Sequence, residues 1–156
     1  MPSRFYEDFE VGQSTATDQD YLVTREEIIE FATKWDPQPF HIDEEAAKAS
    51  QFKGLTAAGM HLLAIAGRLW HQIEGKPVVI AGLEWDEILF LKPVRPNDRL
   101  SLRVKCTHKK ASSSKPDRGI IHTLITLTNQ GGDIVLSFRD KILVSRKAPL
   151  TPSSGS

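Results

Sequence analysis

The sequence predicts an α+β domain in which helices come first and an antiparallel sheet follows. Apolar residues recur at helical spacing up to about residue 74, and after Pro77 they alternate with a period of two. The segment 55–73 is apolar nearly all round, which indicates a helix buried on most sides. We therefore expect a strongly curved antiparallel sheet wrapped around one long helix at residues 56–74.

The first helix is predicted to begin after Thr24 and to end at Trp35. Thr24 and Glu27 form a capping box, in which the hydroxyl and the carboxylate each bind a free backbone N–H. Pro37 ends the helix because it disfavours the α conformation at the preceding residue. Pro39 acts in the same way, so we expect a stiff extended loop at residues 36–41.

Two further helices are expected before the sheet. Asp43 is a suitable N-cap for a short helix, and Thr56 for the long apolar one. Both Trp70, on that helix, and Trp85, on a later strand, are predicted to lie in the core. The expected strands cover residues 78–81, 84–91, 100–106, 119–128 and 134–144.

Length and composition set limits on the class of protein. The chain has 156 residues with 20 basic and 20 acidic side chains, so it has no overall attraction for nucleic acid or for an anionic membrane. We place one domain at residues 1–146 and a disordered tail at 147–156. No apolar run approaches the roughly 18 residues of a membrane span, and the N-terminus does not resemble a signal peptide, so we expect a soluble, cytoplasmic protein. The single Cys106 and the unpaired histidine spacing predict no metal site.

Two places in the sequence could carry chemistry. Asp36 and His41 lie five positions apart on backbone restrained by prolines, and such a pair can hold and activate a water molecule. Without further evidence, an Asp and a His at this spacing are more often solvated surface groups than a catalytic pair. Gly59 lies near the start of the long helix, where a free N–H can bind an oxyanion. The alternative for Gly59 is a close contact between helix and sheet.

A resemblance to a known family includes both the Asp36–His41 segment and Gly59. Residues 36–41, Asp-Pro-Gln-Pro-Phe-His, resemble the Asp-x-Asn-Pro-x-His motif of the MaoC-like dehydratases, relatives of the (R)-specific enoyl-CoA hydratases with a hotdog fold. Other sequence blocks of that family are matched, in the same order along the chain, by residues 5–13, 41–50, 58–60 and 90–98.

The resemblance implies hydration of a trans-2-enoyl-CoA thioester to the (R)-3-hydroxyacyl-CoA, or the reverse dehydration. Asp36 and His41 would be the catalytic pair, and which of them is the base stays open. The Gly59 N–H would bind the thioester oxyanion. Three neighbours are expected to contact the substrate: Trp35, Gln38 and Phe40. The resemblance also implies no cofactor, an acyl-CoA partner, and a homodimer or oligomer of dimers with the pocket near the subunit interface.

Three positions depart from the family pattern. Gln38 replaces the usual Asn, Ala58 a common His, and Trp35 a small Gly, which affects the expected substrate more than the reaction. Two other functions stay open. A hotdog acyl-CoA thioesterase is disfavoured because residues 55–73 contain no carboxylate, and a non-catalytic acyl-CoA-binding dimer is disfavoured by the intact Asp36 and His41.

Overall fold

The computed structural model describes residues 2–147 and contains one antiparallel sheet. The strand order is β1–β4–β5–β6–β3, and β2 pairs with β4. The strands are β1 (Ser14–Ala16), β2 (Tyr21–Leu22), β3 (Val79–Phe90), β4 (Arg99–Ala111), β5 (Arg118–Thr128) and β6 (Ile134–Ser145). The helical segments are η1 (Tyr6–Asp8), α1 (Arg25–Trp35), α2 (Pro39–Ile42), α3 (Glu44–Ala49) and α4 (Gly59–Trp70). The α+β prediction is confirmed.

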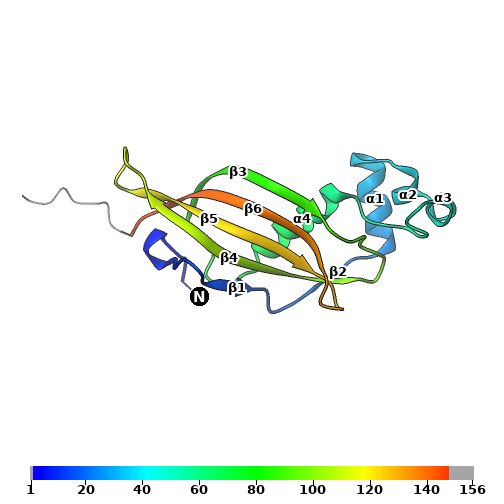
Figure 1. The fold of residues 1–156 in the computed structure, drawn as a ribbon, viewed down its shortest axis with the longest axis horizontal. Coiled ribbons are helices and arrows are strands. Elements are labelled where there is room, and N and C mark those ends of the chain that lie inside the picture. The colour runs from blue at the N-terminus through cyan, green and yellow to red at the C-terminus, as the bar shows by residue number, and fades with distance from the viewer. Residues whose placement is uncertain (1, 148–156) are drawn as a thin grey trace, which may run out of the picture.

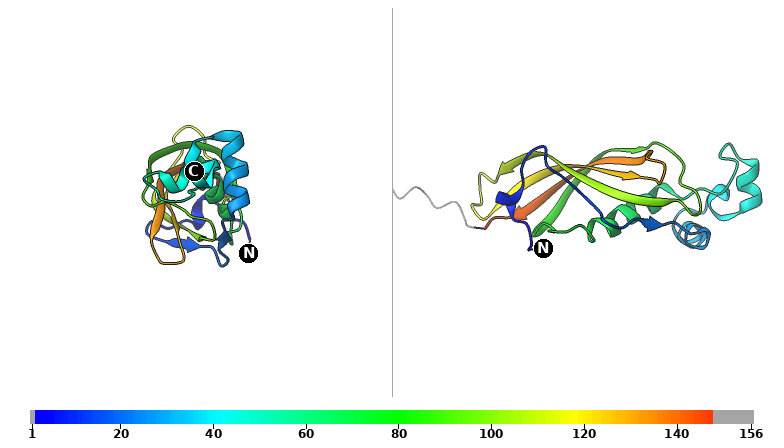
Figure 2. Two further views of the ribbon diagram at one scale, coloured as in Figure 1. Left: turned by 90° about the vertical axis from the view of Figure 1, so that its right-hand side faces the viewer. Right: turned by 90° about the horizontal axis from the view of Figure 1, so that it is seen from below.

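The long strands arch over α4, while α1, α2 and α3 gather at one end of the sheet (Figures 1 and 2). The main core lies between α4 and the inner face of the sheet. Leu62, Ile65 and Leu69 of α4 belong to the same buried cluster as Leu102 of β4 and Ile125 of β5. Burial of these side chains is the main force that fixes the helix beneath the sheet. No helix within residues 2–147 has the length and hydrophobicity that a membrane crossing requires.

The central helix is shorter than predicted. It begins at Gly59 rather than after Thr56 and ends at Trp70. Residues 55–58 are buried but extended, because the Thr56 and Ala57 N–H groups donate to the Phe40 and Val94 carbonyls instead of entering a helix. Apolar periodicity could not distinguish a buried extended segment from the first turn of a buried helix.

The segment 36–41 is also different from the expectation of an extended loop. Pro39 is the first residue of the helical turn α2, where its fixed φ suits a helix and its missing N–H costs nothing. His41 therefore lies on a helical turn. As predicted, α1 ends at Trp35 and Asp43 caps α3, accepting from the Glu45 N–H at 2.9 Å.

Strand β3 is one continuous edge strand where two strands were predicted. Its pairing with β6 has shifts between Val79 and Ala81, between Gly82 and Glu84, and between Asp86 and Leu89. Within residues 2–147 no strand pairs with the free edge of β3, and Trp85 is 53% exposed, so the prediction of a core position for it is wrong. Trp70 is half-buried and Cys106 is buried.

The predicted tail at 147–156 lies outside the described residues except for Lys147. The Lys147 ammonium pairs with the Asp8 carboxylate at 2.6 Å, which ties this point of the chain to η1.

Candidate active site

Asp36, His41 and Gly59 line one cavity of about 560 Å³. They come from three different elements: the end of α1, the turn α2 and the first residue of α4. Phe90 and Leu91, at the end of β3, form another part of its wall. The tertiary structure thus brings together the three residues singled out in the sequence.

His41 is 6% exposed, and its hydrogen bonding fixes its tautomer. Nδ1 lies 2.5 Å from the Thr56 carbonyl oxygen. A carbonyl oxygen only accepts, so Nδ1 carries the proton and donates it. In the neutral ring the lone pair is then on Nε2, which faces the Asp36 carboxylate at 3.6 Å. His41 is therefore oriented as a base toward the cavity.

Asp36 follows α1 directly, and its N–H donates to the Ala32 carbonyl at 2.8 Å. Its carboxylate is one-third exposed. The 3.6 Å between Oδ2 and His41 Nε2 exceeds a direct hydrogen bond, and neutral His41 and ionised Asp36 are both acceptors. A water molecule has two hydrogens and can donate one to each. The pair is therefore suited to orienting a single water.

Gly59 opens α4 behind Ala58, which gives the helix no side-chain cap. Within residues 2–147 the Gly59 N–H has no hydrogen-bond partner, as expected for the first turn of a helix. A Cβ at this position would lie 2.7 Å from Cζ of Phe90. The glycine therefore permits close packing of Phe90 against the helix start, beside an N–H that is free to bind an anionic oxygen.

The chain before α4 is held by Arg95, a residue that our sequence analysis did not single out. Its guanidinium donates to the Gly54 carbonyl at 2.8 Å and also to the Phe52 carbonyl. The sequence feature that could have indicated Arg95 is its position as the one cationic residue between Pro93 and Pro96, within residues 90–98. Arg95 fixes the backbone that leads to Gly59.

A second unpredicted network joins α1 to α4. The Glu27 carboxylate accepts from Tyr21 at 2.5 Å and pairs with His61 Nε2 at 3.0 Å, and the His61 ring stacks on Phe31 at 4.5 Å. Burial and the hydrogen bond to Glu27 raise the pKa of Tyr21 to about 12. Only half of the predicted capping box is present, because Thr24 accepts from the Glu27 N–H while the Glu27 carboxylate serves this network.

The three residues predicted to contact the substrate do not all line the cavity. Phe40 lines the cavity, whereas Trp35 and Gln38 are exposed and do not. Substrate contacts for those two residues stay a prediction that the single chain does not support. No cluster of three or more potential metal ligands occurs in the described part of the chain.

Comparison with known proteins defines the class. Residues 8–129 match the family model of the MaoC-like domain. The chain is 34% identical over 142 residues to the uncharacterized protein YdeM of Bacillus subtilis (strain 168), covering 90% of this chain and 98% of YdeM. It is 34% identical to the MaoC-like dehydratase from Rhodospirillum rubrum, covering 94% of this chain and 99% of that one with a TM-score of 0.85. The R-hydratase PhaJ1 from Pseudomonas aeruginosa shares the fold, with a TM-score of 0.71 at 24% identity over 97% of this chain and 96% of its own.

The chain has the hotdog fold of these proteins. It belongs to the MaoC-like domain family. Membership supports a hydratase or dehydratase activity in general terms.

Proposed function

We propose that this protein adds water to trans-2-enoyl-CoA thioesters, giving (R)-3-hydroxyacyl-CoA, or catalyses the reverse dehydration. One observation carries the proposal: a basic His41 Nε2, the Asp36 carboxylate and the free Gly59 N–H line the same cavity. Hydration of an enoyl thioester needs a base for water and a donor for the carbonyl oxygen, and this cavity offers both.

The proposed reaction starts with a water held between Asp36 and His41. Nε2 of His41 removes a proton as the water oxygen bonds to C3. The C2–C3 π electrons move toward the thioester carbonyl, whose oxygen becomes anionic and is bound by the Gly59 N–H. The imidazolium, stabilised by the Asp36 carboxylate, then returns the proton to C2. One water is consumed and no other reactant is needed.

The tautomer of His41 favours this division of labour, which the sequence left open. With Nδ1 donating to Thr56, only Nε2 can accept a proton from water. Asp36 stays ionised throughout, orients the water and stabilises the positive charge that forms on His41. The acyl-CoA thioesterase alternative is disfavoured because α4, Gly59–Trp70, contains no carboxylate.

The substitution Asp36→Asn tests the proposal. It keeps the shape of the side chain but removes the charge, so we expect kcat to fall by about 10²-fold or more with little change in KM. The assay follows enoyl loss across a series of enoyl-CoA chain lengths, together with the configuration of the 3-hydroxy product and the release of free coenzyme A. Free thiol appearing as fast as the enoyl group disappears would establish a thioesterase instead. Binding without turnover, unchanged by Asp36→Asn, would establish the non-catalytic alternative.

We further propose that two copies pair through β3. This strand is the edge of the sheet and has exposed apolar side chains along its length: Val79, Ile80, Leu83, Trp85, Leu89 and Phe90. An edge of this kind is a template for another strand. A strand paired with its own copy about a two-fold axis runs antiparallel to it. Because Phe90 lines the catalytic cavity, the cavity would lie beside this interface.

The dimer is tested with Leu83→Lys. Leu83 is 46% exposed, and a buried lysine on each side of a two-fold interface is costly, so we expect the variant to be monomeric at micromolar concentration. Val11→Lys is the matched control, since Val11 is exposed but lies on a turn before β1. The measurement is mass by light scattering. A wild-type monomer, or dissociation of both variants alike, would contradict the proposed interface.

A further inference from the structure

Arg95 is a partly buried cation whose guanidinium pairs with no carboxylate in the described part of the chain. It donates instead to three backbone carbonyls: Gly54 at 2.8 Å, Leu55 at 3.4 Å, and Phe52. A hydrogen bond from a charged donor is roughly twice as strong as one between neutral groups. The side chain therefore holds a segment of backbone that lies 40 to 43 positions earlier in the chain.

The peptide group between Leu55 and Thr56 is held at both ends. Its carbonyl accepts from Arg95, and its N–H donates to the Phe40 carbonyl at 3.3 Å. The C=O and the N–H of a trans peptide lie in one plane and point in opposite directions. This peptide group therefore links the arginine to the turn α2.

The next peptide group, between Thr56 and Ala57, makes a parallel link. Its N–H donates to the Val94 carbonyl at 2.9 Å, and its carbonyl accepts from His41 Nδ1 at 2.5 Å. Because the group is planar, the direction of its N–H sets the direction of the carbonyl that His41 meets. Val94 is the neighbour of Arg95, so the backbone and the side chain of one turn hold two consecutive peptide groups.

Two acceptors compete for the single proton of the neutral His41 ring. The Asp36 carboxylate, 3.6 Å from Nε2, favours the Nε2–H tautomer, whereas the Thr56 carbonyl favours Nδ1–H. A proton on Nε2 would prevent that atom from acting as a base toward water. The turn α2 has only 4 residues and is too short to hold the ring by itself. The position of the Thr56 carbonyl therefore decides which tautomer is populated.

We propose that Arg95 is a positioning residue that keeps His41 in the Nδ1–H tautomer. It acts through the Thr56 carbonyl, which it holds within reach of Nδ1, and so leaves Nε2 free to accept a proton. Arg95 does not line the catalytic cavity, so it is not itself a catalytic residue. Its effect on turnover rests on the proposed hydration, whereas its effect on the tautomer does not.

The substitution Arg95→Lys is the main test. Lysine keeps the positive charge but is a compact point donor, so it cannot reproduce the planar fork that holds three carbonyls. We expect part of the His41 population to change to the Nε2–H tautomer. The value of kcat/KM, which reports on the free enzyme, should fall at least in proportion to the Nδ1–H fraction that remains. We expect a loss of about tenfold, the effect of weakening one charge-assisted hydrogen bond, and a larger loss in Arg95→Met.

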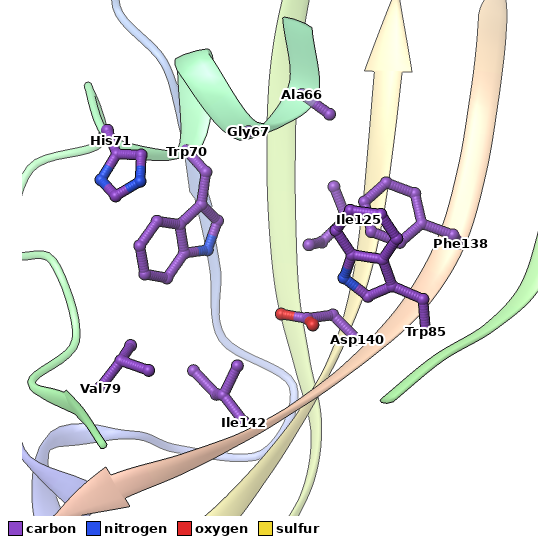
Figure 3. A pocket seen from close by; sticks show the side chains of 10 residues that line it. All are labelled: Ala66, Gly67, Trp70, His71, Val79, Trp85, Ile125, Phe138, Asp140 and Ile142. Atoms are coloured by element: carbon purple, nitrogen blue, oxygen red, sulfur yellow. The ribbon is translucent and has the colours of Figure 1, made fainter. Parts of the chain in front are cut away.

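The tautomer is measured on the full-length protein labelled with ¹⁵N at histidine, at about pH 8.5, where a histidine of ordinary pKa is neutral. Long-range ¹H–¹⁵N correlation spectra distinguish a protonated from an unprotonated ring nitrogen, and the spectrum of His41→Asn identifies the His41 signals. His71 is the internal reference. It lies at the C-terminal end of α4 beside Trp70, at a second cavity that is lined by none of the residues that Arg95 contacts (Figure 3). Its signals should be the same in the wild type and in Arg95→Lys.

The matched control is Arg99→Lys. Arg99 is an exposed cation four positions after Arg95, and it pairs with Asp20 at 3.2 Å. The control makes the same chemical change without touching the segment before α4. Both the His41 tautomer and kcat/KM should therefore stay at their wild-type values.

The contrary outcomes are distinct. An unchanged His41 tautomer in a folded Arg95→Lys protein would overturn the proposal, and any loss of turnover would then come from the stability of the fold alone. The Nε2–H tautomer of His41 in the wild type would overturn it even if the variants failed to fold. If the tautomer changes as expected but the wild type hydrates no enoyl-CoA, the proposed function fails and the link between Arg95 and His41 stands.

Discussion

Replacing His41 by Asn is expected to lower kcat for enoyl-CoA hydration by about 10²–10⁴-fold while the protein stays folded. The Asn amide can still donate to the Thr56 carbonyl in place of Nδ1, so the local hydrogen bond is kept. What is lost is Nε2, the atom that faces Asp36 and would take the proton from water. KM should change little, because the proton transfer occurs in the transition state.

The companion variant is His41→Ala, which removes both ring nitrogens. It should lose as much turnover as His41→Asn and show a lower Tm, because the Thr56 carbonyl loses its partner in a buried position. Steady-state kinetics and thermal unfolding measure the two effects separately. Turnover within a few-fold of wild type in a folded His41→Asn protein would exclude His41 as the base.

Gly59→Ala is expected to have the second largest effect. The new Cβ would lie 2.7 Å from the Phe90 ring, so Phe90 must move, and such overpacking costs about 1–3 kcal/mol of stability. The Cβ at a helix start also leans toward the N-terminus, where the oxyanion has to approach the free N–H. We expect kcat/KM to fall by about 10²–10³-fold, the usual effect of losing one oxyanion donor.

The double variant Gly59→Ala/Phe90→Ala separates these two causes, with Phe90→Ala alone as its control. Removing the Phe90 ring relieves the clash, so the part of the destabilisation caused by Gly59→Ala should disappear. Turnover should stay low relative to Phe90→Ala, because the Cβ still crowds the N–H. If turnover also returned to the level of the control, the glycine would serve only packing against β3, which is the alternative interpretation of this position.

Much of the fold follows from local signals. Thr24 and Pro37 fix the limits of α1, Asp43 caps α3, and alternation after Pro77 places the strands, because caps, prolines and side-chain period act over a few residues. At the start of α4 the prediction failed because of long-range contacts. Residues 55–58 are extended because Phe40 and Val94 supply the carbonyls for their N–H groups.

The same division applies to the candidate site. The sequence by itself was enough to choose the candidate residues, since Asp36, His41 and Gly59 were selected from their types, the prolines around them and the family resemblance. Only the tertiary structure decided that His41 presents Nε2 to Asp36, because the Thr56 carbonyl that fixes its tautomer is 15 positions away. It also decided that Arg95 anchors the approach to Gly59. These contacts depend on how distant segments meet in space, and neither residue spacing nor hydrophobic period specifies that.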